Sequence, residues 1–351
     1  IMAQLRENTW SLDEWYAQDV AGNAGYRGNR QLWVWGRNQN GQLGLDDTTQ
    51  RSSPTQVGTN AGFTGINGGS GRASYGIKGD NNQLWVWGGN NNYGTLGLNS
   101  ETNYSSPVQI PGSWKTFNKG KSSNAGAQGK QLMGVKSSGA LFTWGSQQYG
   151  GLGQNNNTKY VSPVQVGSDT DWASGFDKYY MQGHTCWAIK TDGTLWAWGY
   201  GGWGSLGLGS ANVNKSSPTQ VGTAENWTHV GRNYGSANAA INTDGELWVV
   251  GYGGLGQGNT TPSTSLVKIP GTTWKCQTGV DDGMLAIKTN GELWSWGRNS
   301  NGELGQNNKT QYNNPLQVGT DTTWDRIISG YSSVVATKTN GTMWTWGGDN
   351  A

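Results

Sequence analysis

The stretch LWVWG at residues 32–36 recurs along the chain in almost the same letters. Its copies begin at residues 32, 84, 141, 195, 247, 293 and 343 and read LWVWG, LWVWG, LFTWG, LWAWG, LWVVG, LWSWG and MWTWG. The spacing stays close to about 50 residues, a period typical of propeller blades and solenoid units. The sequence therefore predicts a single repetitive architecture.

A tight hairpin turn precedes most copies. AIKTDGTLW, AINTDGELW, AIKTNGELW and ATKTNGTMW each place a two-residue turn between apolar runs, at Asp192-Gly193, Asp244-Gly245, Asn290-Gly291 and Asn340-Gly341. Asp-Gly and Asn-Gly accept the positive φ angles of such turns. Two antiparallel strands per repeat follow from this pattern.

Two further strands complete each repeat. An in-phase tryptophan opens a short upstream run, at Trp114, Trp172, Trp227, Trp274 and Trp324, with Trp10 as the expected equivalent. Downstream, a GxLG turn leads to a segment such as SSPTQVG, whose proline cannot donate to an inner ladder and so favours the outer edge. Four antiparallel strands repeated seven times predict an all-β, seven-bladed β-propeller.

The N-terminal segment is expected to close the ring. The last repeat ends in WGGDNA without an outer strand, while MAQLRENTW resembles the missing QVGTxxW piece. We expect the N-terminal strand to complete the last blade, so that residues 1–351 form one domain of seven repeats.

Most of the tryptophans are expected in the core. Alternation along LWVWG sends both tryptophans to one side of a blade, and each side faces a neighbouring blade. The repeat motif holds twelve of the 21 tryptophans, and the upstream position holds six more. Burial of each should stabilise the fold by about 2–3 kcal/mol.

The charge, the apolar runs and the cysteine content of the chain limit the classes of function that we expect. Charged residues make up 13% of the chain and the formal net charge is +2, which gives no basic face for nucleic acid. We find no apolar run of about 18 residues and no signal-peptide pattern at the N-terminus, so we expect no membrane insertion and a virion or cytoplasmic location. Cys186 and Cys276 stand far apart, which argues against a disulfide framework.

The sequence shows no catalytic constellation. His184 and His229 fall in different repeats, and Cys-x-x-Cys, His-x-x-x-His and G-x-S-x-G motifs are absent. We therefore expect no enzyme, no cofactor and no metal. Asp281 and Asp282 in GVDDGM leave open a cation site, a carboxylate pair or a solvated turn.

The motifs GxLG, SPxQV and AIKTDGxLWxWG together resemble the repeat of the regulator of chromosome condensation family over essentially the whole chain. The resemblance implies a seven-bladed propeller but not one function. Nuclear members act as exchange factors for a small GTPase, and their basic tail has no match here. The Gly-Trp-Arg-His-Thr strings of a plant UV-B photoreceptor are absent too, GHTCW at residues 183–187 being the nearest. Asn-rich loops and regular LWxWG strings are most similar to divergent bacterial and bacteriophage members.

Two segments depart most from the repeat, residues 118–131 in the third copy and 176–184 in the fourth. If strands run from inner to outer, both emerge on the face opposite the Asp-Gly turns, where binding residues are expected. The predicted cluster suits a sugar or a protein loop, although the same residues could simply pack their own loops. Its members are Tyr149, Tyr179, Tyr180, His184, Tyr200 and Trp203, bordered by Lys119, Lys121 and Lys178.

A second repeated feature is basic. Arg27, Lys78, Lys136, Lys190, Lys288 and Lys338 hold equivalent positions before the hairpin turn, and Asn242 breaks the series. They predict either a basic ring that meets an acidic partner or a solvated rim.

These features predict a non-enzymatic interaction scaffold. A bacteriophage tail or fibre protein that recognises a host-surface glycan or another virion protein through the long-loop face fits them best. An intracellular regulatory propeller that binds a small GTPase or other protein is the alternative, and a tryptophan-based UV-B sensor is a third. The ligand and the oligomeric state stay open.

Overall fold

Short β-strands make up nearly all of the regular structure. The computed structural model describes residues 31–58, 62–68, 73–78, 82–89, 91–119, 131–146, 148–175, 177–182, 184–231, 237–330 and 332–348. Within these ranges the helical elements are two single 3-10 turns, η1 (Asn91–Tyr93) and η2 (Gly202–Gly204). No helix in the described ranges is long and apolar enough to cross a membrane. The all-β prediction is confirmed.

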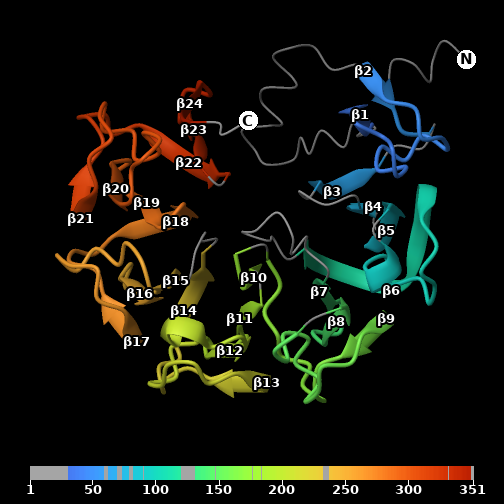
Figure 1. The fold of residues 1–351 in the computed structure, drawn as a ribbon, viewed down its shortest axis with the longest axis horizontal. Coiled ribbons are helices and arrows are strands. Elements are labelled where there is room, and N and C mark those ends of the chain that lie inside the picture. Colours follow the sequence, from blue (N-terminus) through green and yellow to red (C-terminus); the bar gives the residue numbers. More distant parts are fainter. Residues whose placement is uncertain are drawn as a thin grey trace, which may run out of the picture.

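The sheets follow one another around a common centre, from blue β1 to red β24 in Figure 1. We call the sheet built from each repeat a blade and number it by its repeat. Blade one holds β1 (Trp33–Gly36) and β2 (Arg51–Gln56); blade two β3 (Phe63–Gly68), β4 (Ala73–Lys78), β5 (Gln83–Gly88) and the start of β6 (Tyr104–Lys119); blade three the end of β6, β7 (Gln131–Lys136), β8 (Leu141–Gly145) and β9 (Tyr160–Gln165).

The later blades repeat this plan. Blade four holds β10 (Tyr179–Gln182), β11 (Thr185–Ile189), β12 (Leu195–Gly199) and β13 (Lys215–Gln220); blade five β14 (Trp227–Val230), β15 (Ala237–Asn242), β16 (Leu247–Gly251) and β17 (Ser263–Lys268); blade six β18 (Trp274–Val280), β19 (Gly283–Lys288), β20 (Leu293–Gly297) and β21 (Tyr312–Gln317); blade seven β22 (Trp324–Ser329), β23 (Ser333–Lys338) and β24 (Met343–Gly347).

The strand order within a blade is the predicted one. Blades four, five and six are antiparallel sheets in chain order, with the strand that follows or contains the proline at one edge. In blade six Trp274 pairs with Lys288, Ala286 with Trp294, and Trp294 with Gln317. Residues 1–30, with Trp10, Arg27 and the expected closing strand, lie outside the described residues.

In blades three to seven, tryptophans from two strands of the blade pack together on one side of the sheet. In blade six the ring of Trp274 meets Trp294 at 6.3 Å and Trp296 at 6.0 Å between centroids, both edge to face. Trp296 is fully buried and Trp274 nearly so. The prediction that both motif tryptophans share one side is therefore confirmed.

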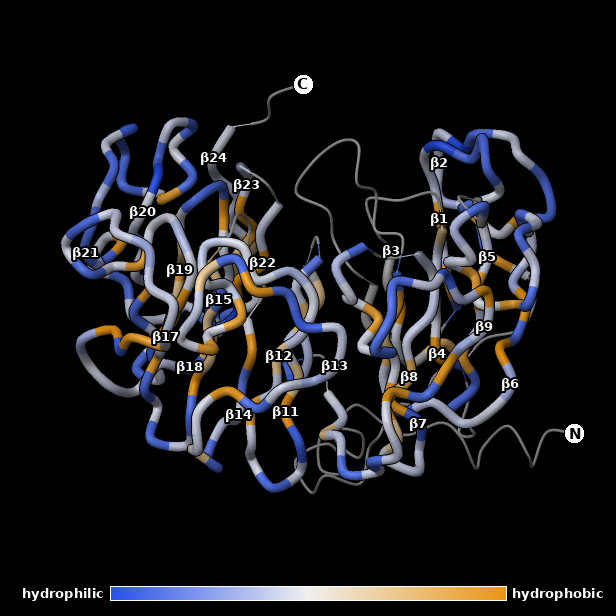
Figure 2. Tube along the Cα trace, turned by 60° about the horizontal axis from the view of Figure 1, so that its bottom comes forward, coloured by the Kyte–Doolittle hydropathy of each residue, from blue (hydrophilic) through white to orange (hydrophobic). Residues whose placement is uncertain are grey.

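The apolar core lies between neighbouring blades. One cluster joins Leu285 and Leu293 of blade six to Trp324 and Val334 of blade seven. Figure 2 shows the same pattern, with apolar stretches along the strands and polar ones in many of the connecting loops. A blade with a neighbour on each side thus has both faces of its sheet buried, and its stability depends on those neighbours.

In blades two, three, four and seven, a tryptophan also ties the blade to the GxLG turn of the blade before it. Trp144 of blade three donates its Nε1 hydrogen bond to the carbonyl of Thr95 in blade two, at 3.0 Å. A Cβ on Gly97 of that turn would lie 2.7 Å from the same nitrogen, so the motif needs glycine there. The bond recurs from Trp87 to Gln42, Trp198 to Gly151 and Trp346 to Glu303. We call this contact the interblade latch.

The lysines of the basic series lie against aromatic rings. The Lys288 ammonium lies 5.3 Å from the Trp274 ring and 4.2 Å from the Trp294 ring, where it gains cation–π attraction while its stem packs on the indoles. The same arrangement occurs for Lys78, Lys136, Lys190 and Lys338. Each described cation of the series thus lies across the aromatic rings of its own blade, and the ring that meets an acidic partner stays a prediction.

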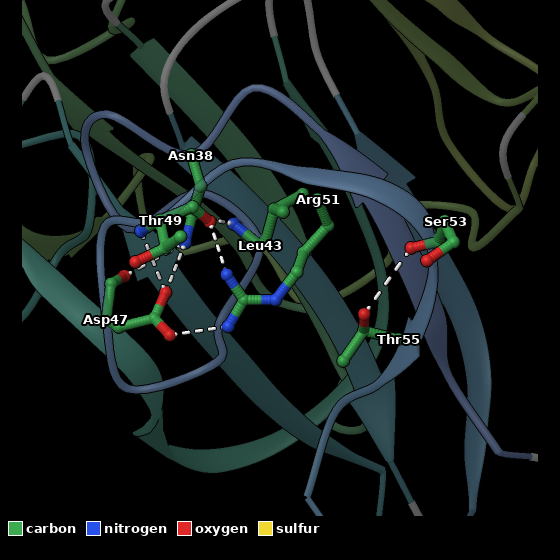
Figure 3. Close-up of polar contacts among 7 residues, drawn as sticks. All are labelled: Asn38, Leu43, Asp47, Thr49, Arg51, Ser53 and Thr55. Atoms are coloured by element: carbon green, nitrogen blue, oxygen red, sulfur yellow. Dashed lines mark hydrogen bonds and ion pairs between the residues drawn. The ribbon is translucent and has the colours of Figure 1, made fainter.

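Polar side chains hold the long loop between the third and fourth strands. In blade one Asn38 accepts a hydrogen bond from the Leu43 amide at 2.8 Å and donates to Asp47 at 3.0 Å (Figure 3). Arg51 pairs with Asp47 and holds the pKa of that carboxyl below its usual range. Asp47 and Arg51 are thus paired with each other across this loop.

Candidate functional site

The long-loop face lies at the end of each blade opposite the Asp-Gly turn. In blade four Thr185 pairs with both Gln182 and Gly199. The connections on either side of this row, which carry His184 and Tyr200, therefore emerge at the same end. This agrees with the loop arrangement inferred from the strand order.

Three of the predicted site residues meet where blades three and four adjoin. The Tyr149 ring lies 5.0 Å from the His184 ring and 5.1 Å from the Tyr200 ring, measured between centroids. The Tyr200 amide donates to the His184 carbonyl at 2.9 Å, which fixes the two residues relative to each other. Tyr149 has φ 62° and keeps 40% of its surface exposed.

A second exposed pair lies where blades four and five adjoin. Trp203 and Tyr252 stack with centroids 5.0 Å apart and planes tilted by 32°, and they are 51% and 40% exposed. Trp203 adopts φ 57°, a left-handed conformation that costs a bulky residue roughly 1–3 kcal/mol and that clusters at functional sites. The indole is thus presented to solvent at a conformational cost.

The two groups adjoin each other. A Cβ built on Gly202 would lie 2.1 Å from the Tyr200 ring, so this ring covers the residue next to Trp203. We call the set Tyr149, His184, Tyr200, Trp203 and Tyr252 the aromatic arc. Its rings combine rigid apolar faces with polar edges, which suits recognition of a partner at low entropic cost.

Sequence reasoning missed Tyr252. Its signal is its place in the repeat, since Tyr252 follows the motif glycine in VVGYGG just as Tyr200 does in AWGYGG. A comparison of repeats at that position finds it.

A polar cavity of about 530 Å³ opens beside Tyr149. Asn157 accepts the Gly150 amide at 2.6 Å and Asn214 accepts the Gly201 amide at 3.1 Å. Both asparagines line the cavity, and their side-chain NH₂ groups keep donors for a ligand. Serine and glutamine complete the lining without any charged group, so the cavity favours a neutral, hydroxyl-rich ligand.

Two predicted site residues belong to the core. Tyr179 and Tyr180 are only 1% and 4% exposed and pack in the interblade clusters on opposite sides of β10. Burial raises the pKa of the Tyr179 hydroxyl well above its usual range. They cannot contact a ligand on the surface, and their inclusion in the site is wrong.

Lys178 takes part in a contact between blades. Its ammonium donates to the carbonyl of Thr228 in blade five, and its own carbonyl accepts the Ile189 amide, which places it toward the short-turn end. The neighbouring Asp177 carboxylate lies 3.2 Å from Nδ1 of His229. Although burial opposes ionisation, His229 and Lys178 bring the pKa of Asp177 to about 2.

Lys178 therefore does not border the aromatic arc, because its ammonium group is hydrogen-bonded to Thr228 of blade five. Lys121 and the side chain of Lys119 lie outside the described residues.

Asp281 and Asp282 do not form a free carboxylate pair. Asp281 is nearly buried and binds Arg298 at 2.8 Å. Burial, with the charge of Asp281, raises the pKa of Asp282. Within the described ranges, no three His, Cys, Asp or Glu side chains gather in a way that could hold a metal ion.

The blades and their interblade tryptophans define a repeat β-propeller. The family model described as "Regulator of chromosome condensation (RCC1) repeat" matches residues 31–71, 81–123, 138–174, 192–231 and 290–337, more than half of the chain. The chain belongs to the RCC1 repeat family, as the motifs predicted.

Several relatives share part of this sequence. The Ultraviolet-B receptor UVR8 of Arabidopsis thaliana is 26% identical over 308 residues, which cover 81% of this chain and 64% of the receptor. The Probable E3 ubiquitin-protein ligase HERC4 of Homo sapiens is 29% identical over 203 residues, 56% of this chain and 18% of the ligase. The chain thus spans less than two thirds of either relative.

Solved structures share the fold. Human WBSCR16 superposes with a TM-score of 0.69 at 20% identity over 88% of this chain and 81% of its own. Prp20p from Saccharomyces cerevisiae gives 0.69 at 17% identity over 90% and 80% of the two chains, and its structure was described with its binding to Gsp1p and histones. At these identities the likeness extends to the fold alone.

Proposed function

We propose that this chain is a non-enzymatic recognition scaffold that binds a neutral glycan through the aromatic arc. The observation that carries the proposal is the stacked, half-exposed pair Trp203 and Tyr252, in which Trp203 has a left-handed backbone. Aromatic faces pack on the apolar sides of sugar rings, and the uncharged amides beside Tyr149 supply hydrogen bonds to hydroxyl groups. A bacteriophage tail or fibre that recognises a host surface is the setting that we propose for this activity.

A glycan array tests the proposal. The wild-type protein is compared with a Trp203→Ala, Tyr252→Ala double variant and with Leu316→Ala, whose exposed side chain on blade six is 40% accessible like that of Tyr252. We expect the wild type and Leu316→Ala to bind the same neutral glycans and the double variant to lose at least tenfold in affinity. No glycan binding by the wild type, or equal binding by the double variant, would refute the proposal.

A protein partner is the second candidate. The fold likeness to Prp20p favours it, because that propeller was characterised through its protein partners. In this case the chain is a regulatory propeller, and the same arc contacts a protein loop. Affinity capture with wild type and the double variant distinguishes this outcome, since only the wild type should retain the partner.

We also propose that the ring has seven blades and closes by pairing of the N-terminal strand with β24. The seven LWxWG copies and the QVGTxxW-like piece near the N-terminus support it. Met343 and Trp344 of β24 are 69% and 49% exposed among the described residues, as expected for an edge strand that a further strand would cover on pairing with it.

Hydrogen exchange checks the closure. Amides of β24 should exchange slowly in the full chain and at least tenfold faster after residues 2–10 are removed, because the strand then loses its partner. Amides of β20 serve as the internal control and should be unchanged. Equal protection of β24 in both proteins would contradict closure by this segment.

A further inference from the structure

A groove of about 440 Å³ lies between the outer strand of blade two and strands β6, β7 and β9 of blade three. Its lining includes the apolar residues Leu98, Pro111 and Pro163 and the buried residues Ile110 and Trp114. Lys136 is the charged residue of the lining, and no carboxylate takes part in it. The residues that line this groove are not those of the aromatic arc, and they belong to other strands and loops.

The Lys136 ammonium rests on aromatic rings at the base of this groove. It lies 4.2 Å from the Phe142 ring and 5.2 Å from the Trp114 ring. Gly112 leaves the space for it, since a Cβ there would come within 3.3 Å of Nζ. The described residues provide Lys136 with aromatic contacts and with no ion pair.

The equivalent lysines of blades four, six and seven do have carboxylate partners. Lys190 binds Asp169 at 2.7 Å and Asp171 at 3.1 Å. Lys288 binds Glu292 at 3.3 Å, and Lys338 binds Asp321. These acids stand at three repeat positions: three residues before the upstream tryptophan, directly before it, or four residues after the lysine.

Blade three has lost the acid at all three positions. Pro111 stands three residues before Trp114, Ser113 directly before it, and Ala140 four residues after Lys136. The adjoining groove between blades one and two keeps a carboxylate in its lining, Asp46. The cation of blade three is thus left without the countercharge that the lysines of blades four, six and seven receive.

We propose that this groove binds an extended acidic segment of a protein partner, with one Asp or Glu side chain paired to Lys136. The paired lysines of blades four, six and seven show that a carboxylate fits beside a lysine stacked in this way. A cation on aromatic rings away from bulk water attracts a carboxylate more strongly than an exposed lysine does. The apolar residues of the lining, the two prolines included, would contact the side chains that flank the acidic residue of a peptide. A small organic acid is too short to reach both these residues and Lys136.

The test uses a positional-scanning library of acetylated and amidated hexapeptides on the immobilised full chain. We expect Asp or Glu to be enriched at least tenfold over Asn or Gln at one position. Lys136→Met removes the charge, keeps the aliphatic stem and should abolish the enrichment. Lys190→Met, in a blade whose cation is already paired, is the matched control and should leave it unchanged.

A second variant supplies the countercharge from within the chain. Ser113→Asp recreates the Asp171 position of blade four, so the new carboxylate should pair with Lys136 and compete with the peptide while the groove wall stays intact. We expect the acidic preference to disappear without any fall in the thermal unfolding midpoint. The proposal is overturned if wild type shows no acidic preference, or if Ser113→Asp retains it.

Discussion

Replacing Gly97 with alanine should lower the free energy of unfolding by about 2–5 kcal/mol. Gly97 has φ +66°, and a left-handed conformation costs an L-residue roughly 1–2 kcal/mol. The added methyl group would also lie 2.7 Å from Nε1 of Trp144. That indole is fully buried and held from its other side by Trp114, 5.6 Å away between ring centroids. Overpacking of such a site costs about 1–3 kcal/mol more.

Gly222 provides a matched control for this prediction. It has the same φ of +66°, yet a Cβ there would meet nothing within 4 Å. Gly222→Ala should therefore lose only the backbone part, about 1–2 kcal/mol. Guanidinium unfolding followed by circular dichroism measures both variants. Equal losses would mean that the contact with the Trp144 indole contributes nothing to the fold.

The strands of this protein were predictable because their signals are local. Alternation in LWxWG and the Asn-Gly or Asp-Gly turn each act within a few residues, and together they specify two strands and the hairpin between them. The interblade latch was not predictable in this way. Its glycine is required not only by its positive φ but also by an indole from the next repeat, about 50 residues further along the chain, as Gly97 and Trp144 show.

The candidate site was predicted in part for the same reason. Tyr149, Tyr200 and Trp203 lie in loops, where departure from the repeat does indicate exposure. Tyr179 and Tyr180 lie in a strand of a blade whose two sides are both buried. Alternation separates a buried from an exposed face only when one face meets water, so it gave no warning that both tyrosines belong to the core.

The lysine series illustrates a third limit. A lysine before a hairpin turn reads as a solvated residue, since nothing in its own strand suggests otherwise. The aromatic partners of Lys288 come from the two flanking strands, at Trp274 and Trp294. Strand pairing brings the lysine and the two tryptophans together only once the sheet has formed. The same stack of a lysine on aromatic rings then recurs in blades two, three, four and seven.

The valine at position 250 explains why Trp187 stands at a position where the other repeats have no tryptophan. Blade five has Val250 where other motifs end in tryptophan, so it lacks the indole of the interblade latch. Trp187, on β11 of blade four, instead donates to the Ser205 carbonyl at 3.2 Å and is 1% exposed. Asn238 of blade five donates to the same oxygen at 2.8 Å. Trp187 and Val250 share one core cluster.

Trp187→Ala should therefore lower the free energy of unfolding by about 3–5 kcal/mol, the cost of emptying a buried indole site. Trp203→Ala, with 51% of its side chain exposed, should lose less than about 1 kcal/mol because its removal leaves no cavity. Chemical unfolding of the two variants gives the comparison. A loss below 1 kcal/mol for Trp187→Ala would show that Val250 and its neighbours close the gap unaided.

Adding Val250→Trp to the Trp187→Ala variant tests whether the indole itself is what matters. The new side chain starts from the motif position that serves blades two, three, four and seven, and it would enter the space vacated by Trp187. We expect the double variant to recover at least half of the lost stability, since the Ser205 carbonyl regains a donor and the cavity is filled. A double variant no more stable than the single one would mean that blade five has adapted its backbone to valine, so that the latch between these two blades depends on Trp187 alone.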